Sequence, residues 1–133
     1  MSKYVATYAV TFVVMVALDM IWLGVVAKSF YQEGIGHLMA EKPVVSVAVA
    51  FYVVYAIGLV FFAVVANEAL TGYGKTALYG ALFGFFAYAT YDLTNLATLK
   101  NWPVGLALLD MAWGTVVSAV SAVAGKALLD RFA

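Results

Sequence analysis

The chain contains no cysteine, and only one of its 133 residues is a histidine, His37. The first absence excludes disulfide bonds, thiolate metal ligands and a cysteine nucleophile. The second leaves little room for a histidine-based metal site. Charged residues make up only 11% of the sequence, and seven basic residues are balanced by seven acidic ones. Without a basic surplus, the chain is not expected to bind nucleic acid.

Apolar side chains, in contrast, account for 66% of the residues. Soluble domains contain about 45–50% apolar and about 25% charged residues. A domain this small cannot bury so much apolar surface in water, so lipid must form part of its surroundings. The apolar residues form four continuous runs, which we place at residues 4–27, 43–66, 76–97 and 104–127. Each has about the 20 residues that a helix needs to cross a bilayer.

The four runs predict a single all-α domain, a polytopic membrane protein built as a four-transmembrane-helix up-down bundle. Backbone groups in lipid must be hydrogen-bonded within their segment, which favours helices. The first run is longer than the apolar core of a signal peptide and contains Asp19, so we expect it to be retained. Short connections place both termini on one side. Four basic residues on that side against three on the other slightly favour a multi-pass protein with cytoplasmic termini.

Three aspartates lie within the apolar runs, where an ionised carboxylate costs about 3 kcal/mol or more. At a rise of about 1.5 Å per residue, Asp19 lies about 12 Å before the end of the first helix. By the same estimate, Asp92 lies about 8 Å before the end of the third helix and Asp110 about 10 Å into the fourth. Helices one and three end on the side where helix four begins. The three carboxylates are therefore expected to lie in one layer of the membrane.

Other polar and small residues share a helical face with these aspartates. On the third helix, at about 100° per residue, Asp92 and Asn95 share a face with Gly80 and Gly84. These two glycines form a GxxxG step, which allows another helix to approach closely. The opposite face is expected to contact lipid, and it carries Leu82, Phe83, Phe86 and Leu93. The fourth helix has a similar stripe of small and polar residues, formed by Asp110, Gly114, Ser118, Ser121 and Gly125.

We predict that these faces enclose a polar site within the membrane. Carboxylate and amide oxygens are ligands that magnesium, calcium and manganese accept, but the spacing alone supports no metal site and none is predicted. Trp102, which precedes Pro103, is interpreted as an anchor at the membrane interface. The predicted ligand-binding residues are Asp19, Trp22, Tyr52, Tyr55, Tyr91, Asp92, Asn95, Asp110 and Trp113.

The pattern Leu-Asp-Met-x-Trp occurs twice, at residues 18–22 and 109–113. In each copy the aspartate and the tryptophan are three residues apart and share a helical face. Because the first and fourth helices run antiparallel, the two copies are consistent with a decayed inverted repeat. Coincidence among apolar residues explains the pattern equally well, so no prediction rests on it.

Several motifs spread over nearly the whole chain carry a family resemblance. They are Asp19 with Trp22, then Phe51, Tyr52 and Tyr55, then Tyr88-Ala-Thr-Tyr-Asp-Leu-Thr-Asn-Leu-Ala-Thr98 with Trp102-Pro103, and finally Asp110-Met-Ala-Trp-Gly114. Together they resemble the bacterial membrane family named domain of unknown function 2177. The resemblance implies a small polytopic inner-membrane protein. Genes of this family often lie near those of lipid-modifying enzymes, which implies a role linked to lipid, but it implies no activity, substrate or catalytic residue.

The predicted site is compatible with more than one function. The first is binding or translocation of a small ligand, lipid or cation, coupled to the protonation of a carboxylate. The second is a membrane enzyme of lipid modification that uses an aspartate as general acid or base, and the third is an accessory subunit of a larger membrane complex. Whether the protein is an enzyme stays open, and its cofactors and catalytic residues are unknown. The expected partners are membrane lipid and, through the small-residue faces, a second copy of the chain or a partner membrane subunit.

Overall fold

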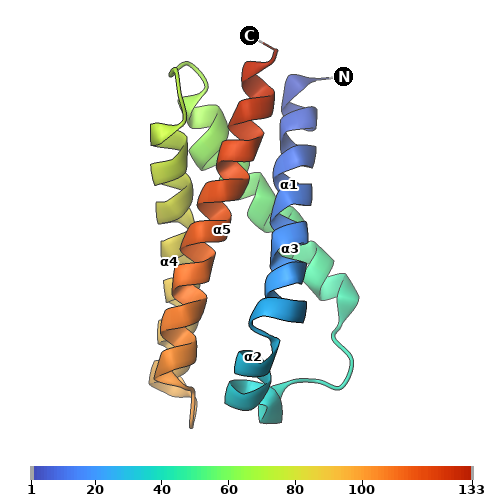
Figure 1. Cartoon of the computed structure of the whole chain (residues 1–133), viewed down its shortest axis with the longest axis vertical. Coiled ribbons are helices and arrows are strands. Elements are labelled where there is room, and N and C mark those ends of the chain that lie inside the picture. Colours follow the sequence, from blue (N-terminus) through green and yellow to red (C-terminus); the bar gives the residue numbers. More distant parts are fainter. Residues whose placement is uncertain (1, 133) are drawn as a thin grey trace.

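The computed structural model describes residues 2–132, and the regular elements within this range are all helices. The α-helices are α1 (Lys3–Ile21), α2 (Lys28–Ile35), α3 (Val45–Leu59), α4 (Gly74–Thr98) and α5 (Val104–Asp130). π-Helical turns extend α1 through Trp22–Val26 and α3 through Val60–Val64, and short 3-10 turns occur at Gly36–Leu38 and Val65–Asn67. Both ends of the chain lie at one end of the bundle, and α2 lies at the other (Figure 1).

Within residues 2–132, three segments are long and apolar enough to cross a membrane, namely Lys3–Val26, Val45–Asn67 and Val104–Asp130. The prediction of an all-α membrane protein is thus confirmed, whereas the predicted number of four spans is not. The 25 residues of α4 would extend about 37 Å at 1.5 Å per residue, so its length suffices. Its glycines, threonines and tyrosines, together with Asp92 and Asn95, make it less apolar than the other three segments.

Helices α4 and α5 lie side by side (Figure 1), and their backbones come close to one another where both carry small residues. A Cβ atom added to Gly84 would lie only 2.2 Å from the carbonyl oxygen of Gly114 and 2.5 Å from Oγ of Ser118. One added to Gly80 would lie 2.9 Å from Cβ of Ala122. The predicted GxxxG step therefore faces the small-residue stripe of α5, and the absence of side chains lets the two backbones meet.

Helix α2 lies within residues 28–42, where the sequence predicts only a polar connection. Two contacts with α5 hold it in place. The Cβ position of Gly34 lies 3.2 Å from Pro103 and 3.3 Å from Leu106, and the hydroxyl group of Tyr31 donates a hydrogen bond to Asp110. Because these partners are distant in sequence, docking against α5 accounts for a helix that local composition does not indicate.

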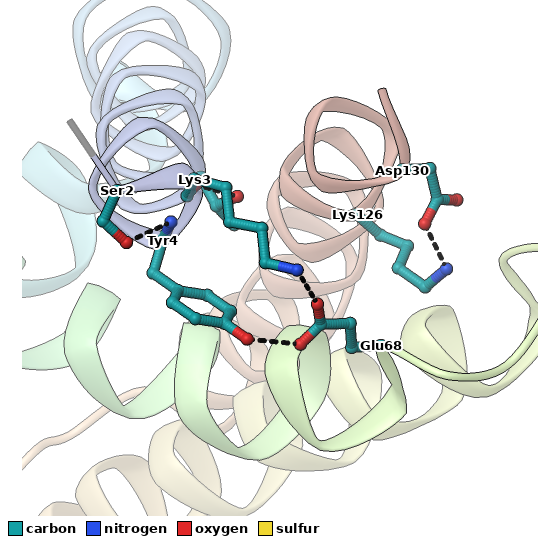
Figure 2. A network of polar contacts seen from close by, with 7 residues as sticks. Ser2, Lys3, Tyr4, Glu68, Lys126 and Asp130 are labelled. Carbon is teal, nitrogen blue, oxygen red and sulfur yellow. Dashed lines mark hydrogen bonds and ion pairs between the residues drawn. The ribbon is translucent and has the colours of Figure 1, made fainter. Parts of the chain in front are cut away.

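Polar contacts connect α1, the α3–α4 link and α5 at the end that holds the termini (Figure 2). The ammonium group of Lys3 lies 2.6 Å from Oε2 of Glu68, whose Oε1 accepts a hydrogen bond of 2.8 Å from the Tyr4 hydroxyl. Nearby, the buried Lys126 donates to the carbonyl oxygen of Leu70 at 2.9 Å and to Oδ1 of Asp130 at 2.7 Å. These contacts fix the relative positions of three segments where the bundle meets water.

The contacts of Glu68 predict a small loss of stability in acid. Hydrogen bonds from Lys3 and Tyr4 to the carboxylate lower the pKa of Glu68 below its usual value. A lowered folded-state pKa contributes stability above the unfolded-state pKa, and this contribution is lost as the pH falls through the folded-state value. We expect the wild-type melting temperature in detergent to fall more than that of Glu68→Gln between about pH 6 and pH 3. Identical acid sensitivity of the two proteins would show that the ion pair does not contribute.

Candidate functional site

A cavity of about 470 Å³ lies among all five α-helices. Its volume falls within the range of about 300–1,000 Å³ that is typical of small-molecule sites. The acidic residues that line it come from the end of α1, the end of α4 and the beginning of α5, so the cavity lies in the half of the bundle away from the termini (Figure 1). All three intramembrane aspartates, Asp19, Asp92 and Asp110, line this cavity.

Asp19 is held by two hydrogen bonds from other helices. The indole Nε1 of Trp113 in α5 donates to its Oδ1 at 2.7 Å, and the hydroxyl group of Tyr52 in α3 donates to its Oδ2. Asp19 itself is buried, with only 5% of its surface exposed. Both carboxylate oxygens therefore have a partner, and the side chain joins α1, α3 and α5.

Asp110 is held through Tyr31, a residue of α2. The Tyr31 hydroxyl donates to Oδ1 of Asp110 at 2.5 Å and accepts a hydrogen bond of 3.2 Å from Nε1 of Trp22. The indole rings of Trp22 and Trp113 stack, with centroids 4.4 Å apart and planes inclined by 3°. Each tryptophan of the repeated pattern thus reaches the aspartate of the other copy, Trp113 directly and Trp22 through Tyr31.

Asp92 differs from the other two aspartates because its carboxyl group makes no hydrogen bond. It is fully buried, and neither of its carboxylate oxygens has a hydrogen-bond partner. Its nearest polar neighbours are Asp110 and the indole of Trp102, which lie close to it, but neither meets the geometry of a hydrogen bond with it. The Nε1 atom of Trp102, a residue with 8% of its surface exposed, also has no partner. The cavity wall therefore carries two buried acceptors and one buried donor that remain unused, although more than nine-tenths of buried polar groups in proteins are paired.

Aromatic side chains form much of the remaining wall. The rings of Tyr91 and Trp102 are nearly perpendicular, with centroids 5.8 Å apart. The Tyr55 hydroxyl makes a hydrogen bond of 2.7 Å with Oγ of Ser118. Among the described residues, 2–132, no lysine, arginine or histidine lines the cavity. The titratable residues that surround Asp92 in the lining are Asp19, Tyr31, Tyr52, Tyr55, Tyr88, Tyr91 and Asp110.

Residues 4–127 match the model of the family described as "Predicted membrane protein (DUF2177)". The chain belongs to this family. The match agrees with the three apolar spans and identifies a multi-pass membrane protein. No curated protein and no solved structure matches the chain.

In this DUF2177 protein, most of the predicted site residues meet around the cavity. Two of them differ in position. Trp22 lies behind the wall, stacked on Trp113, and Asn95 is half-buried on α4 outside the lining. Asn95 is one turn beyond Asp92, toward the end of α4, where the helix leaves the cavity. Within residues 2–132, no group of three histidine, cysteine, aspartate or glutamate side chains is placed to hold a metal ion.

Eight of the fifteen lining residues of this family member were not among the predicted ligand-binding residues, and three of the eight carry polar groups: Tyr31, Tyr88 and Trp102. Trp102 was interpreted as an interfacial anchor, but it is buried and lines the cavity, immediately before Pro103, the N-cap of α5. Tyr88 shares a helical face with Asp92, a signal that the sequence contains. Tyr31 lies in a segment without apolar periodicity, so no local signal indicates its contact with Asp110.

Proposed function

We propose that this protein binds a small ligand within the membrane, at the cavity, and that Asp92 exchanges its proton for that ligand. The single observation that carries the proposal is the state of Asp92, which is fully buried, faces the cavity and has two unpartnered oxygens. An ionised carboxylate without partners in a low-dielectric interior costs several kcal/mol. Asp92 therefore needs either a proton or a bound partner, and the two exclude one another.

The other two aspartates have a different role in this proposal. Both oxygens of Asp19 and one oxygen of Asp110 accept hydrogen bonds from side chains of other helices. A carboxylate that is held in this way stabilises the walls of the cavity. Asp19 and Asp110 are thus positioning residues, which orient Trp113, Tyr52 and Tyr31, whereas Asp92 contacts the ligand.

The membrane arrangement that we propose places α4 in the bilayer as a fourth span of an inner-membrane protein. On the side of α4 next to the Asp92 face, the apolar side chains of Leu82, Phe86 and Leu93 are exposed, which is what lipid contact requires. Helix α4 also packs along α5, an apolar span. The polar residues that lower the hydropathy of α4 face the cavity and α5, where lipid does not reach them.

A carbodiimide that dissolves in lipid tests the proposal. Dicyclohexylcarbodiimide adds to a protonated carboxyl group, so it reports on a buried acid that is reachable from the membrane. With the protein in nanodiscs, we expect one adduct, on Asp92, located by mass spectrometry of peptides. Labelling should become faster as the pH falls, because the reagent needs the protonated acid. Asp19 and Asp110 should react at least about tenfold more slowly, because hydrogen bonds hold both oxygens of Asp19 and Oδ1 of Asp110.

Asp92→Asn and Glu41→Gln form a matched pair of controls, because each replaces one acid by its amide, and Glu41 lies exposed in the α2–α3 link. The first variant should lose the adduct, and the second should keep it. Equal labelling of all three aspartates, or none in the folded protein, would show that the carboxyl group of Asp92 is not specially accessible. The buried acids would then be structural, as in an accessory subunit.

A further inference from the structure

We infer that the ligand of this cavity is a protonated amine carried on an apolar body. This inference rests on the proposed function and names the chemical class that the site accepts. The first reason is charge. Three of the fifteen lining residues are aspartates, and within residues 2–132 none of the lining is basic. A carboxylate or phosphate entering this wall would meet charges of its own sign in a low-dielectric site, where repulsion is strongest.

Inorganic cations fit the site less well than an ammonium group. Calcium takes six to eight oxygen ligands and magnesium demands near-octahedral coordination. The oxygens of Asp19 are both used by Tyr52 and Trp113, and Oδ1 of Asp110 is used by Tyr31. Asp92 alone offers two unused oxygens. Oδ2 of Asp110 makes no hydrogen bond within residues 2–132 either, which brings the unused carboxylate oxygens of the lining to three. Three oxygens are fewer than the six that either cation requires, whereas the N–H groups of an amine need only hydrogen-bond acceptors.

Aromatic rings supply the second attraction for a cation. Eight of the fifteen lining residues are phenylalanine, tyrosine or tryptophan. Beside Asp92, the nearly perpendicular rings of Tyr91 and Trp102 form two walls of a corner. A cation near the face of such a ring is attracted by its π electrons, with about 0.5–1 kcal/mol at an exposed ring and about 2 kcal/mol or more at a desolvated one. Trp102 is buried, whereas Tyr91 is 52% exposed, so Trp102 supplies the stronger attraction. An ammonium group in this corner would contact both rings and the carboxylate of Asp92.

The size and polarity of the rest of the cavity indicate that the ligand carries an apolar group beside its ammonium group. The cavity of about 470 Å³ is much larger than an ammonium group needs. Besides the aspartates and the aromatic rings, its wall includes Leu23, Ile35 and Leu106, from the π-helical turn after α1, from α2 and from α5. The unused Nε1 of Trp102 is a donor that can meet an oxygen on the same ligand. Both a free lipophilic amine and the ethanolamine headgroup of a lipid contain this shared ammonium chemistry.

Tryptophan fluorescence provides a direct test, because all three tryptophans of the chain line the cavity or stack on its wall. The protein is placed in nanodiscs of phosphatidylcholine, which adds no net charge to the membrane. It is titrated near neutral pH with four molecules of equal chain length: octylamine, octyltrimethylammonium, octanol and octanoate. A fifth titration with dihexanoyl phosphatidylethanolamine distinguishes a lipid headgroup from a free amine.

We expect saturable binding of octylamine, at least about tenfold tighter than that of octanol or octanoate, because only the amine supplies a counter-charge. Octyltrimethylammonium should bind more weakly than octylamine, because it has no N–H group to donate to Asp92. Asp92→Asn should weaken octylamine binding by about tenfold or more, and Glu41→Gln should leave it unchanged. Binding of the phosphatidylethanolamine as tight as that of octylamine identifies a lipid headgroup, and weaker binding identifies a free amine.

Two results would overturn the inference. The first is binding of octanol or octanoate as tight as that of octylamine, and the second is binding of octylamine that Asp92→Asn does not change. Carbodiimide labelling separates these from a failure of the proposed function. If octanol protects Asp92 from labelling as well as octylamine does, the cavity binds ligands but does not select an ammonium group. If Asp92 is not labelled at all, the binding site itself is refuted.

Discussion

Replacing Gly84 by leucine should separate α4 from α5 and cause the largest loss of stability of any single substitution considered for this protein. Even the Cβ atom would lie 2.2 Å from a backbone carbonyl oxygen, that of Gly114. Backbone cannot rotate away as a side chain can, so the helices must move apart. Overpacking in a close-packed interior costs about 1–3 kcal/mol and occasionally more, and contact with backbone places this case at the upper end, at about 3 kcal/mol or more. The gain in helix propensity, about 1 kcal/mol, is too small to compensate.

A second glycine of the same helix provides the control. The Cβ position of Gly74, at the first turn of α4, has no atom within 4 Å. Gly74→Leu should therefore leave the melting temperature nearly unchanged, while Gly84→Leu lowers it sharply or prevents folding. The measurement is thermal unfolding in detergent, followed by circular dichroism. Gly84→Ala is a milder variant that keeps the comparison possible if the leucine variant does not fold. Equal stability of Gly84→Leu and Gly74→Leu would mean that the two helices do not meet at Gly84.

The contact between α4 and α5 is also the part of the fold that the sequence predicts best. A GxxxG step on one helix and a stripe of small residues on the other are needed for close approach, and both patterns are local and regular. The long apolar runs likewise lie within a few residues of the helices, because hydrophobic length is a property of the segment itself. Depth within a helix follows from counting residues, which is why three aspartates that are far apart in sequence were expected in one layer.

Contacts that depend on tertiary packing were not predictable in this way. Phe83 was assigned to the lipid-facing side of α4, but its ring packs against Gly58 of α3, 2.7 Å from the Cβ position of that glycine. Helix α3 crosses the bundle obliquely (Figure 1), so it covers a face that a parallel bundle would leave to lipid. The crossing angle follows from side-chain packing between helices and has no signature in a single sequence.

The repeated Leu-Asp-Met-x-Trp pattern shows a further limit. The sequence alone could not separate an inverted repeat from coincidence. In the structure, the antiparallel helices α1 and α5 bring Trp22 and Trp113 face to face, and each indole points toward the aspartate of the opposite copy. The pairing is not symmetric, because Tyr31 stands between Trp22 and Asp110. The two Trp–Asp contacts therefore differ by the Tyr31 hydroxyl group of α2, and Tyr31 lies outside the repeated pattern.

The second large effect that we expect is a contrast between two aspartates of the same cavity. Asp19→Leu should destabilise the protein by about 1–3 kcal/mol, because it removes the acceptor of two hydrogen bonds. Single contacts between membrane helices average about 0.6 and reach about 1.7 kcal/mol, so two of them give this range. The Nε1 of Trp113 can only donate, and no other acceptor is bonded to it. Asp92→Leu should leave stability unchanged or raise it, because the carboxylate that it removes has no hydrogen bond.

Both variants are unfolded in detergent beside the wild-type protein under one set of conditions. The comparison decides whether the buried aspartates all stabilise the fold or whether Asp92 is kept for binding. A group that stabilises the fold is expected to be costly to remove, as for Asp19. A group that is buried, unpaired and harmless to remove is retained at a cost in stability, which is typical of residues kept for binding or chemistry. If Asp92→Leu destabilised the protein as much as Asp19→Leu, then Asp92 would have partners in the fold. The two acids would then share a structural role, and the ligand assigned to Asp92 would lose its physical basis.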